Sequence, residues 1–167
     1  MLRRVNGVPE VRILDVQSNL ANTYQMLGRL EEAMPLRRDA YSGYLKLRGE
    51  EHAKTINAAN NYAASFMLSK RFKEAKSLWR KTIPVAQRVL GKSDAFTLTS
   101  QINYARALYT DPGATLDDVR EALTTLEETE RTARRVLGAA HPEVVKDELD
   151  LRAVRAALAA ARETPSP

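Results

Sequence analysis

The sequence repeats itself at a fixed interval. An Asn-Leu-Ala triplet at residues 19–21 is echoed by Asn-Tyr-Ala at residues 61–63 and again at residues 103–105, an interval of 42 positions each time. The Leu-Gly pair that closes the second copy at Gly91 returns at Gly138, which indicates an insertion of five residues in the third copy. A fixed period in this range is typical of a stacked array, whose units bury their apolar faces against one another.

Apolar periodicity, glycine stops and proline starts predict seven helices and no strands. We expect an all-α fold, an α-α superhelix of three helix pairs followed by a C-terminal capping helix. Thr115 is placed to cap the helix that follows it, and Pro142 suits a first helical turn. The predicted helices cover residues 11–27, 30–47, 53–69, 72–90, 95–110, 116–137 and 142–161.

This pattern also predicts the domain organisation. We expect a flexible lead-in at residues 1–10, a single solenoid domain at residues 11–162 and a disordered tail at residues 163–167. Within the solenoid, the repeats are predicted at residues 11–52, 53–94 and 95–141, and the capping helix at residues 142–162.

Residues that recur in the repeats are predicted to form the core. Small alanines allow neighbouring helices to approach closely, at Ala21, Ala63 and Ala105 in the first helices and at Ala33, Ala75 and Ala122 in the second. Larger side chains should fill the gaps between helices, with Trp79 packed in the core rather than stacked on a ligand. The other predicted gap-filling residues are Tyr24, Phe66, Phe72, Leu78, Leu108 and Leu126.

Composition narrows the class of protein. Hydrophobic residues make up 44% and charged residues 28% of the chain, as in a globular domain. We find no apolar run near the ~20 residues that span a bilayer and no signal peptide, so we expect a soluble cytoplasmic protein without membrane insertion. The absence of cysteine fits a reducing compartment. A net charge of +5 without a basic stripe interleaved with aromatics does not favour nucleic acid.

The chain carries no pattern typical of catalysis. His52 and His141 occupy the same junction position in copies about two repeats apart, too far to share a metal ion. Phosphate-binding loops, serine-elbow motifs and metal-ligand spacings are missing from the sequence. We therefore predict that the protein is not an enzyme and uses no metal or cofactor.

The repeat residues are similar to a known family. Gly-Arg-Leu-Glu-Glu-Ala-Met-Pro-Leu at residues 28–36, Val-Leu-Gly at 136–138 and His-Pro-Glu-Val at 141–144 resemble tetratricopeptide repeats of the long, kinesin-light-chain type. The resemblance extends over about residues 11–160. It implies a protein-interaction scaffold and adaptor rather than motor activity.

If the stack is the tetratricopeptide one, the first helices line a concave groove. Side chains spaced 3, 4 and 3 along each helix share a face, and amides there can bind a peptide backbone. Arg106 and Lys146 could receive a carboxylate, and Met67, Ile102 and Tyr109 could hold an apolar side chain. The hypothesis is a groove for a short extended peptide with acidic and apolar residues, formed by Asn22, Gln25, Asn57, Asn60, Met67, Ile102, Arg106, Tyr109 and Lys146.

The competing interpretation is that these are ordinary solvated positions and that the partner binds elsewhere. The recurrent Asn19, Asn61 and Asn103 lie one position from the predicted row, and inter-helix or inter-repeat hydrogen bonding explains them better than ligand contact. Arg37 stands where Trp79 stands in the next repeat, and Asp150 replaces the recurrent asparagine. Arginines of the second helices are predicted on the convex side: Arg37, Arg38, Arg80, Arg88, Arg131, Arg134 and Arg135.

Two other functions remain open. The chain could be a structural subunit or a self-associating module that packs through the ends of the array. An exposed apolar face at an end of the array would favour this function. An RNA-binding helical repeat is less favoured, because few predicted groove residues are basic. The sequence leaves the oligomeric state and the identity of the partner open.

Overall fold

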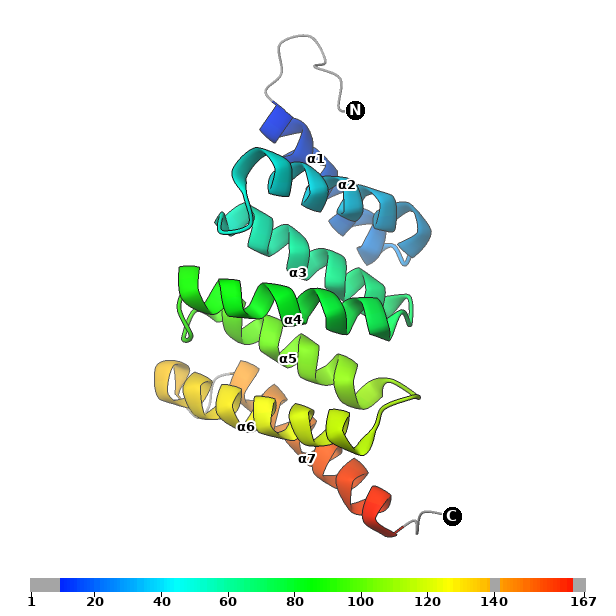
Figure 1. Ribbon diagram of the computed structural model, residues 1–167, viewed down its shortest axis with the longest axis vertical. Coiled ribbons are helices and arrows are strands. Elements are labelled where there is room, and N and C mark those ends of the chain that lie inside the picture. The colour runs from blue at the N-terminus through cyan, green and yellow to red at the C-terminus, as the bar shows by residue number, and fades with distance from the viewer. Residues whose placement is uncertain (1–9, 139–141, 164–167) are drawn as a thin grey trace. The chain divides into compact units, whose positions relative to one another are not determined.

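The computed structural model describes residues 10–138 and 142–163, without the side chains of 142–143, 145–147 and 161–163, and all regular structure in these residues is helical. The predicted helices are confirmed with bounds that differ by a few residues at most (Figure 1). The predicted lead-in and tail, apart from Glu10 and Glu163, lie outside the described residues. The helices are α1 (Glu10–Met26), α2 (Leu30–Arg48), α3 (Ala53–Leu68), α4 (Phe72–Val89), α5 (Ala95–Thr110), α6 (Leu116–Leu137) and α7 (Pro142–Glu163).

The helices form two compact units. Unit 1 is residues 1–89, with α1 to α4, and unit 2 is residues 90–167, with α5 to α7. The division lies close to the predicted junction between the second and third repeats. That residues 11–162 form a single solenoid domain stays a prediction.

In unit 1, each helix packs against the next one along the chain. Leu14 of α1 and Tyr44 of α2 form one core cluster with Ala40 and Ala58. Gly43 allows α1 and α2 to approach closely, because a Cβ at this position would stand 2.5 Å from the Cδ2 atom of Leu14. A glycine inside a helix costs about 1 kcal/mol relative to alanine, and here the close contact explains its presence.

In unit 2, α6 packs against both α5 and α7. Leu98, Ala133 and Val144 form a core cluster that takes one residue from each of the three helices. Leu108 and Leu126 have no exposed surface, as predicted for core positions.

The predicted core positions are mostly confirmed in both units. The six recurrent alanines are at most 1% exposed, and Trp79 and Phe66 are buried. Tyr24, Phe72 and Leu78 are only half-buried. Small residues thus set the helix spacing, and the large residues that fill the gaps differ from copy to copy.

Helix ends follow the predicted turn chemistry. The Thr115 hydroxyl accepts a hydrogen bond from the Asp118 backbone N–H at 3.1 Å, and the Asp118 carboxylate accepts one from the Thr115 backbone N–H, which completes a capping box. His52 caps α3 through a single side-chain bond, since its Nδ1 atom accepts from the Lys54 backbone N–H at 3.2 Å. His52 therefore lies in the turn between α2 and α3 and caps the helix that follows it.

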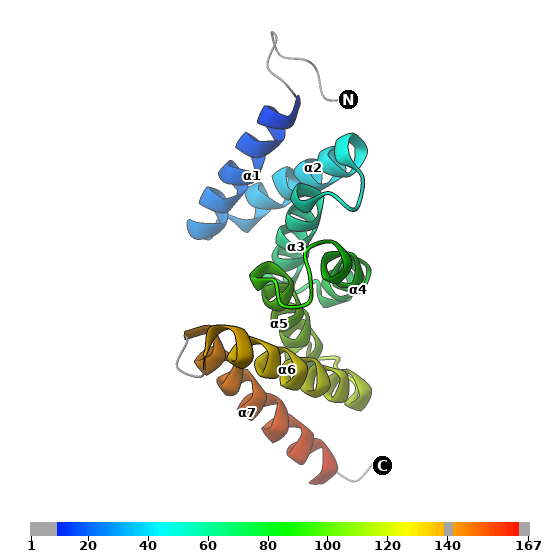
Figure 2. The same cartoon turned by 90° about the vertical axis from the view of Figure 1, so that its left-hand side faces the viewer.

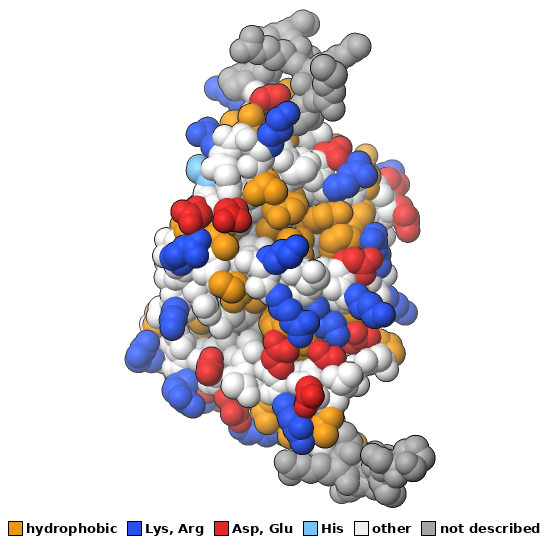
Figure 3. All heavy atoms as spheres, viewed as in Figure 1, with side chains coloured by type: hydrophobic (Ala, Val, Ile, Leu, Met, Phe, Trp, Pro, Cys, Tyr) orange, Lys and Arg blue, Asp and Glu red, His pale blue; other side chains and the backbone are white. Residues whose placement is uncertain are grey.

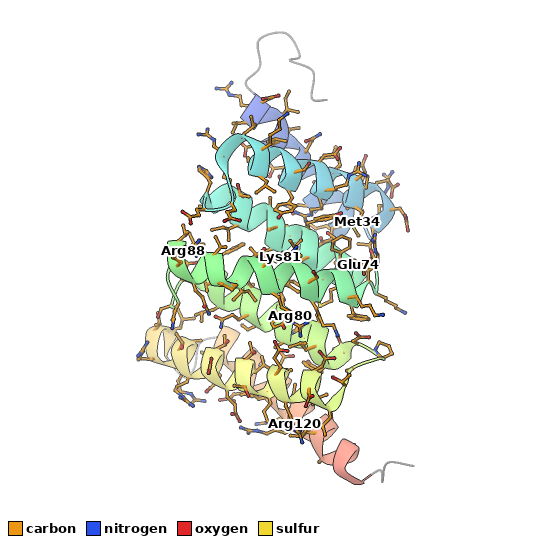
Figure 4. All side chains as sticks on the ribbon, in the orientation of Figure 1. Met34, Glu74, Arg80, Lys81, Arg88 and Arg120 are labelled. Carbon is orange, nitrogen blue, oxygen red and sulfur yellow. The ribbon has the colours of Figure 1, made fainter. Side chains whose placement is uncertain are left out.

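The arginines predicted on the convex side are exposed on α4, whereas Arg37 is not, and the convex placement stays a prediction. Arg80, Lys81 and Arg88 extend from α4 as exposed side chains (Figure 4), and Arg88 donates to Glu51 at 2.6 Å. Figure 3 shows Lys and Arg side chains along α4 beside a group of hydrophobic side chains over α2. Arg37, in contrast, is buried between α1 and α2 with 4% of its surface exposed.

Within the described part of the chain, no helix combines the length and the apolar character needed to cross a membrane.

Candidate functional site

Unit 1 contains a polar cavity of about 300 Å³, which we call the amide cavity. Helices α1 and α3 supply most of its lining, and Tyr44 of α2 completes one wall. Four of its side chains are asparagine amides that come from two different helices. The lining residues are Asp15, Ser18, Asn19, Asn22, Tyr44, Lys54, Asn57, Ala58 and Asn61.

Asp15 fixes one wall of the amide cavity. Its carboxylate accepts hydrogen bonds from Lys54 Nζ at 2.6 and 2.8 Å and from the Tyr44 hydroxyl at 2.5 Å. The bond from Lys54, followed by that from Tyr44, lowers the pKa of Asp15. Burial, together with Asp15, raises the pKa of Tyr44, so the phenol keeps its proton at neutral pH. Lys54 and Asp15 balance each other, and this wall carries little net charge.

Amides of α3 form another part of the cavity lining. Asn61 Nδ2 donates to Asn57 Oδ1 at 2.8 Å, so the two side chains are aligned along one helix turn. Asn57 keeps its own N–H groups as donors, and Asn61 keeps its oxygen as an acceptor. The sequence-based interpretation of Asn61 as an inter-helix bond is therefore wrong, because its partner lies in the same helix.

Asn19 and Asn61 are cavity residues that the predicted site did not include. Asn19 is exposed and Asn61 is half-buried. Their recurrence 42 residues apart was a usable signal, because equivalent positions in successive first helices face the same surface of a stack. Lys54 and Asp15 had no such signal, since their contact joins residues 39 positions apart in sequence.

Arg37 orients two of the predicted groove amides. Its Nη2 atom donates to Asn22 Oδ1 at 2.6 Å and to Gln25 Oε1 at 3.2 Å. A guanidinium group only donates, so both amide oxygens face Arg37 and both amide nitrogens face away from it. The Arg37 Nε atom has no acceptor among the described residues, and burial lowers the pKa of this group. Asn22 and Gln25 are thus donors backed by a buried positive charge.

Replacement of Arg37 by leucine is expected to raise the free energy of unfolding by about 1 kcal/mol, because exchange of a buried charge for an apolar side chain is often stabilising. Asn22 is exposed and Gln25 half-buried, so water can satisfy their oxygens in the variant. Urea unfolding followed by circular dichroism measures the change. Arg37→Lys is the matched control, with no gain expected; a loss of more than about 1 kcal/mol in Arg37→Leu would show that the two amide bonds outweigh the desolvation of the charge.

Asn60 is a structural residue rather than a surface one. It is 5% exposed, and its Oδ1 atom accepts a hydrogen bond from Trp79 Nε1 at 2.8 Å. A buried indole N–H requires such an acceptor. Asn60 therefore does not face a groove, and its prediction as a groove residue is wrong. Met67, another predicted groove residue of α3, is half-buried.

Two of the predicted groove residues of unit 2, Arg106 and Tyr109, donate hydrogen bonds to Asp150. Its carboxylate accepts from Arg106 Nε and Nη2 at 2.9 and 2.5 Å and from the Tyr109 hydroxyl at 2.8 Å. Burial and the bond to Asp150 raise the pKa of Tyr109 to about 12, so the phenol donates at neutral pH. Ile102 is buried with 5% exposure and faces no groove, and the side chain of Lys146 is outside the described residues. Arg106 already holds a carboxylate of its own chain.

Comparisons with known proteins agree with the repeat pattern. The tetratricopeptide repeat family model matches residues 13–53 and 55–94, which coincide with the first two predicted repeats. No curated protein was found to match the sequence significantly.

Solved structures share the fold over nearly the whole chain. Among them are the nearly identical TPR-like repeats of a Podosopora anserina protein described as a kinesin light chain, with 23% identity, a TM-score of 0.80, and coverage of 93% of this chain and 71% of the other. A Q17M form of that protein gives a TM-score of 0.81 at the same identity and coverage. BtubC (BKLC) from P. vanneervenii is 19% identical, with a TM-score of 0.79 and coverage of 98% of this chain and 70% of the other. The chain therefore contains tetratricopeptide repeats at residues 13–53 and 55–94, and it has the fold of kinesin-light-chain-like repeats.

Proposed function

We propose that this protein is an adaptor that binds a short extended peptide segment of a partner protein in the amide cavity of unit 1. Tetratricopeptide repeats generally serve as protein-interaction scaffolds and are generally not enzymes. The observation that supports the proposal best is the convergence of asparagine amides from α1 and α3 on one polar cavity.

The hydrogen-bonding capacity of the cavity suits a peptide backbone. A backbone offers N–H donors and C=O acceptors in alternation, and Asn19, Asn57 and Asn61 together offer both kinds of group. The cavity volume of about 300 Å³ suits a few residues of extended chain rather than a folded domain. The paired charges of Asp15 and Lys54 leave a neutral wall that does not repel either kind of charged segment.

Two features favour a peptide with acidic and apolar residues. The outward amide nitrogens of Asn22 and Gln25 are donors backed by the positive charge of Arg37, which suits a carboxylate. Met67 is a half-buried apolar residue further along α3. We leave Asn60 and Ile102 out of the proposed surface because both are buried, and Arg106 because it pairs with Asp150.

Peptide display on the full chain, followed by fluorescence anisotropy with a selected peptide, tests the proposal. We expect Asn57→Ala/Asn61→Ala to weaken binding by about tenfold or more, which corresponds to about 1.4 kcal/mol. The matched control is Ser42→Ala/Lys46→Ala, two exposed polar residues of α2 that do not line the cavity. Circular dichroism should show unchanged helix content in both variants. Selected peptides that bind the cavity variant as tightly as the wild type would refute the amide cavity as the binding site.

A further inference from the structure

Helix α1 carries a row of exposed apolar side chains on the side away from α2. Val16 is 64%, Leu20 41% and Leu27 64% exposed, whereas Leu14 and Ala21 on the same helix are fully buried. These exposed residues are spaced four and seven positions apart, so they lie along one face of the helix. Figure 2 shows α1 beside α2 at one end of unit 1. We call Val16, Leu20 and Thr23 of α1, together with Leu27 directly after the helix, the outer row of α1.

The 42-residue register identifies the equivalent face on α3. Val16, Leu20 and Thr23 correspond to Ala58, Tyr62 and Ser65. On α3 this face is covered by α2, and Ala58 and Ser65 are buried as a result of helix packing. Whereas the face is covered on α3, the same face on α1 is exposed.

Contacts on α3 show what covers such a face. Ala58 belongs to the core cluster that contains Ala40 and Tyr44 of α2. The Tyr62 ring lies 6.2 Å from the ring of Tyr41, measured between centroids. The covering element is therefore a helix that presents a small residue and aromatic residues at neighbouring positions of one face.

The outer row of α1 is more apolar than its counterpart on α3. Val16 replaces an alanine, Leu20 replaces a tyrosine with a polar hydroxyl, and Leu27 stands at the position of Ser69. The row carries no charged residue, so burial of its side chains removes apolar surface from water without desolvating an ion.

We infer that the outer row of α1 docks an amphipathic helix of a partner protein, in the register that α2 adopts on α3. An extended segment fits less well, because the row follows helical spacing and the equivalent interface within the chain is helix against helix. A folded second copy cannot supply its α2 for this purpose, because the matching face of that α2 already covers its own α3. This surface is separate from the amide cavity, and the inference does not depend on peptide binding there.

The probe is a helix-stapled peptide with the α2 sequence of residues 30–48, which carries the required face. We expect it to bind the full chain saturably, and we expect Leu20→Glu in the chain to weaken that binding by about tenfold or more. Leu45→Glu is the matched control variant, since Leu45 is an exposed leucine of α2 with 39% exposure and lies outside the outer row. A second peptide with Tyr41→Glu and Tyr44→Glu should lose binding, because both substitutions place a charge on the docking face.

Two further measurements distinguish a partner helix from the other possible occupants of the outer row, namely a second copy of the chain and the chain's own residues. Light scattering should give a monomer mass for the wild type and for Leu20→Glu, and the two proteins should melt at the same temperature. A wild-type dimer that Leu20→Glu dissociates would overturn the inference in favour of a second copy. A large fall in the melting temperature would show that the chain's own residues cover the row. Absence of saturable peptide binding, or equal binding to wild type and Leu20→Glu, would also overturn it.

Discussion

Replacement of Trp79 by alanine is expected to lower the free energy of unfolding of unit 1 by about 3–5 kcal/mol, as for other fully buried large aromatic residues. Trp79 has no exposed surface, so its loss leaves a cavity between helices that the surrounding core can fill only in part. The substitution also removes the indole N–H group that donates to Asn60 Oδ1, so this buried oxygen loses its protein partner.

Urea unfolding followed by circular dichroism measures this effect, and Trp79→Phe is the control. Phenylalanine keeps most of the apolar volume but not the N–H group, so we expect a smaller loss of about 1–3 kcal/mol. A loss below about 1 kcal/mol in Trp79→Ala would contradict a core role for this residue.

Replacement of Asp150 by alanine is expected to lower the free energy of unfolding of unit 2 by about 2 kcal/mol. The substitution removes the carboxylate to which both Arg106 and Tyr109 donate, and with it the charge that pairs with the Arg106 guanidinium group. We place the effect below that of a fully buried pair because 21% of the Arg106 side chain and 13% of the Asp150 side chain are exposed, so water partly compensates the loss.

Asp150→Asn is the matched control, since it restores the residue type found at the equivalent position of the first three copies. The amide oxygen can accept hydrogen bonds but carries no charge, so we expect about half of the loss seen with alanine. Chemical denaturation of both variants provides the measurement. Equal stability of Asp150→Ala and the wild type would mean that the bonds from Arg106 and Tyr109 to Asp150 have no net stabilising effect.

The predicted site residues differ in outcome because helical spacing gives the direction of a side chain but not what lies opposite it. Asn57 and Asn60 were predicted on one face of α3, yet Asn57 is exposed at the amide cavity and Asn60 is buried against Trp79. The three-residue step between them turns the helix by about 300°, so the two side chains point some 60° apart, and a neighbouring helix can cover one and not the other. Ile102 is buried in the same way.

Arg37 shows the same limit for a charged residue. From the sequence it was expected on the convex side with the other arginines of the second helices, but it occupies the interior position that Trp79 fills in the next repeat. Its charge there is met by the amide oxygens of Asn22 and Gln25, and no local pattern indicates a contact between residues 12 and 15 positions apart.

The sequence by itself determined the repeat, the helices and most of the core. The 42-residue interval, the recurrent alanines and the glycines at helix ends act locally or repeat at a fixed period, so they can be read without a structure. The tertiary structure alone decided which polar side chains of different helices meet. Lys54 reaches Asp15 and Arg106 reaches Asp150 across 39 and 44 residues of sequence, because helix packing brings together side chains that no periodic pattern relates.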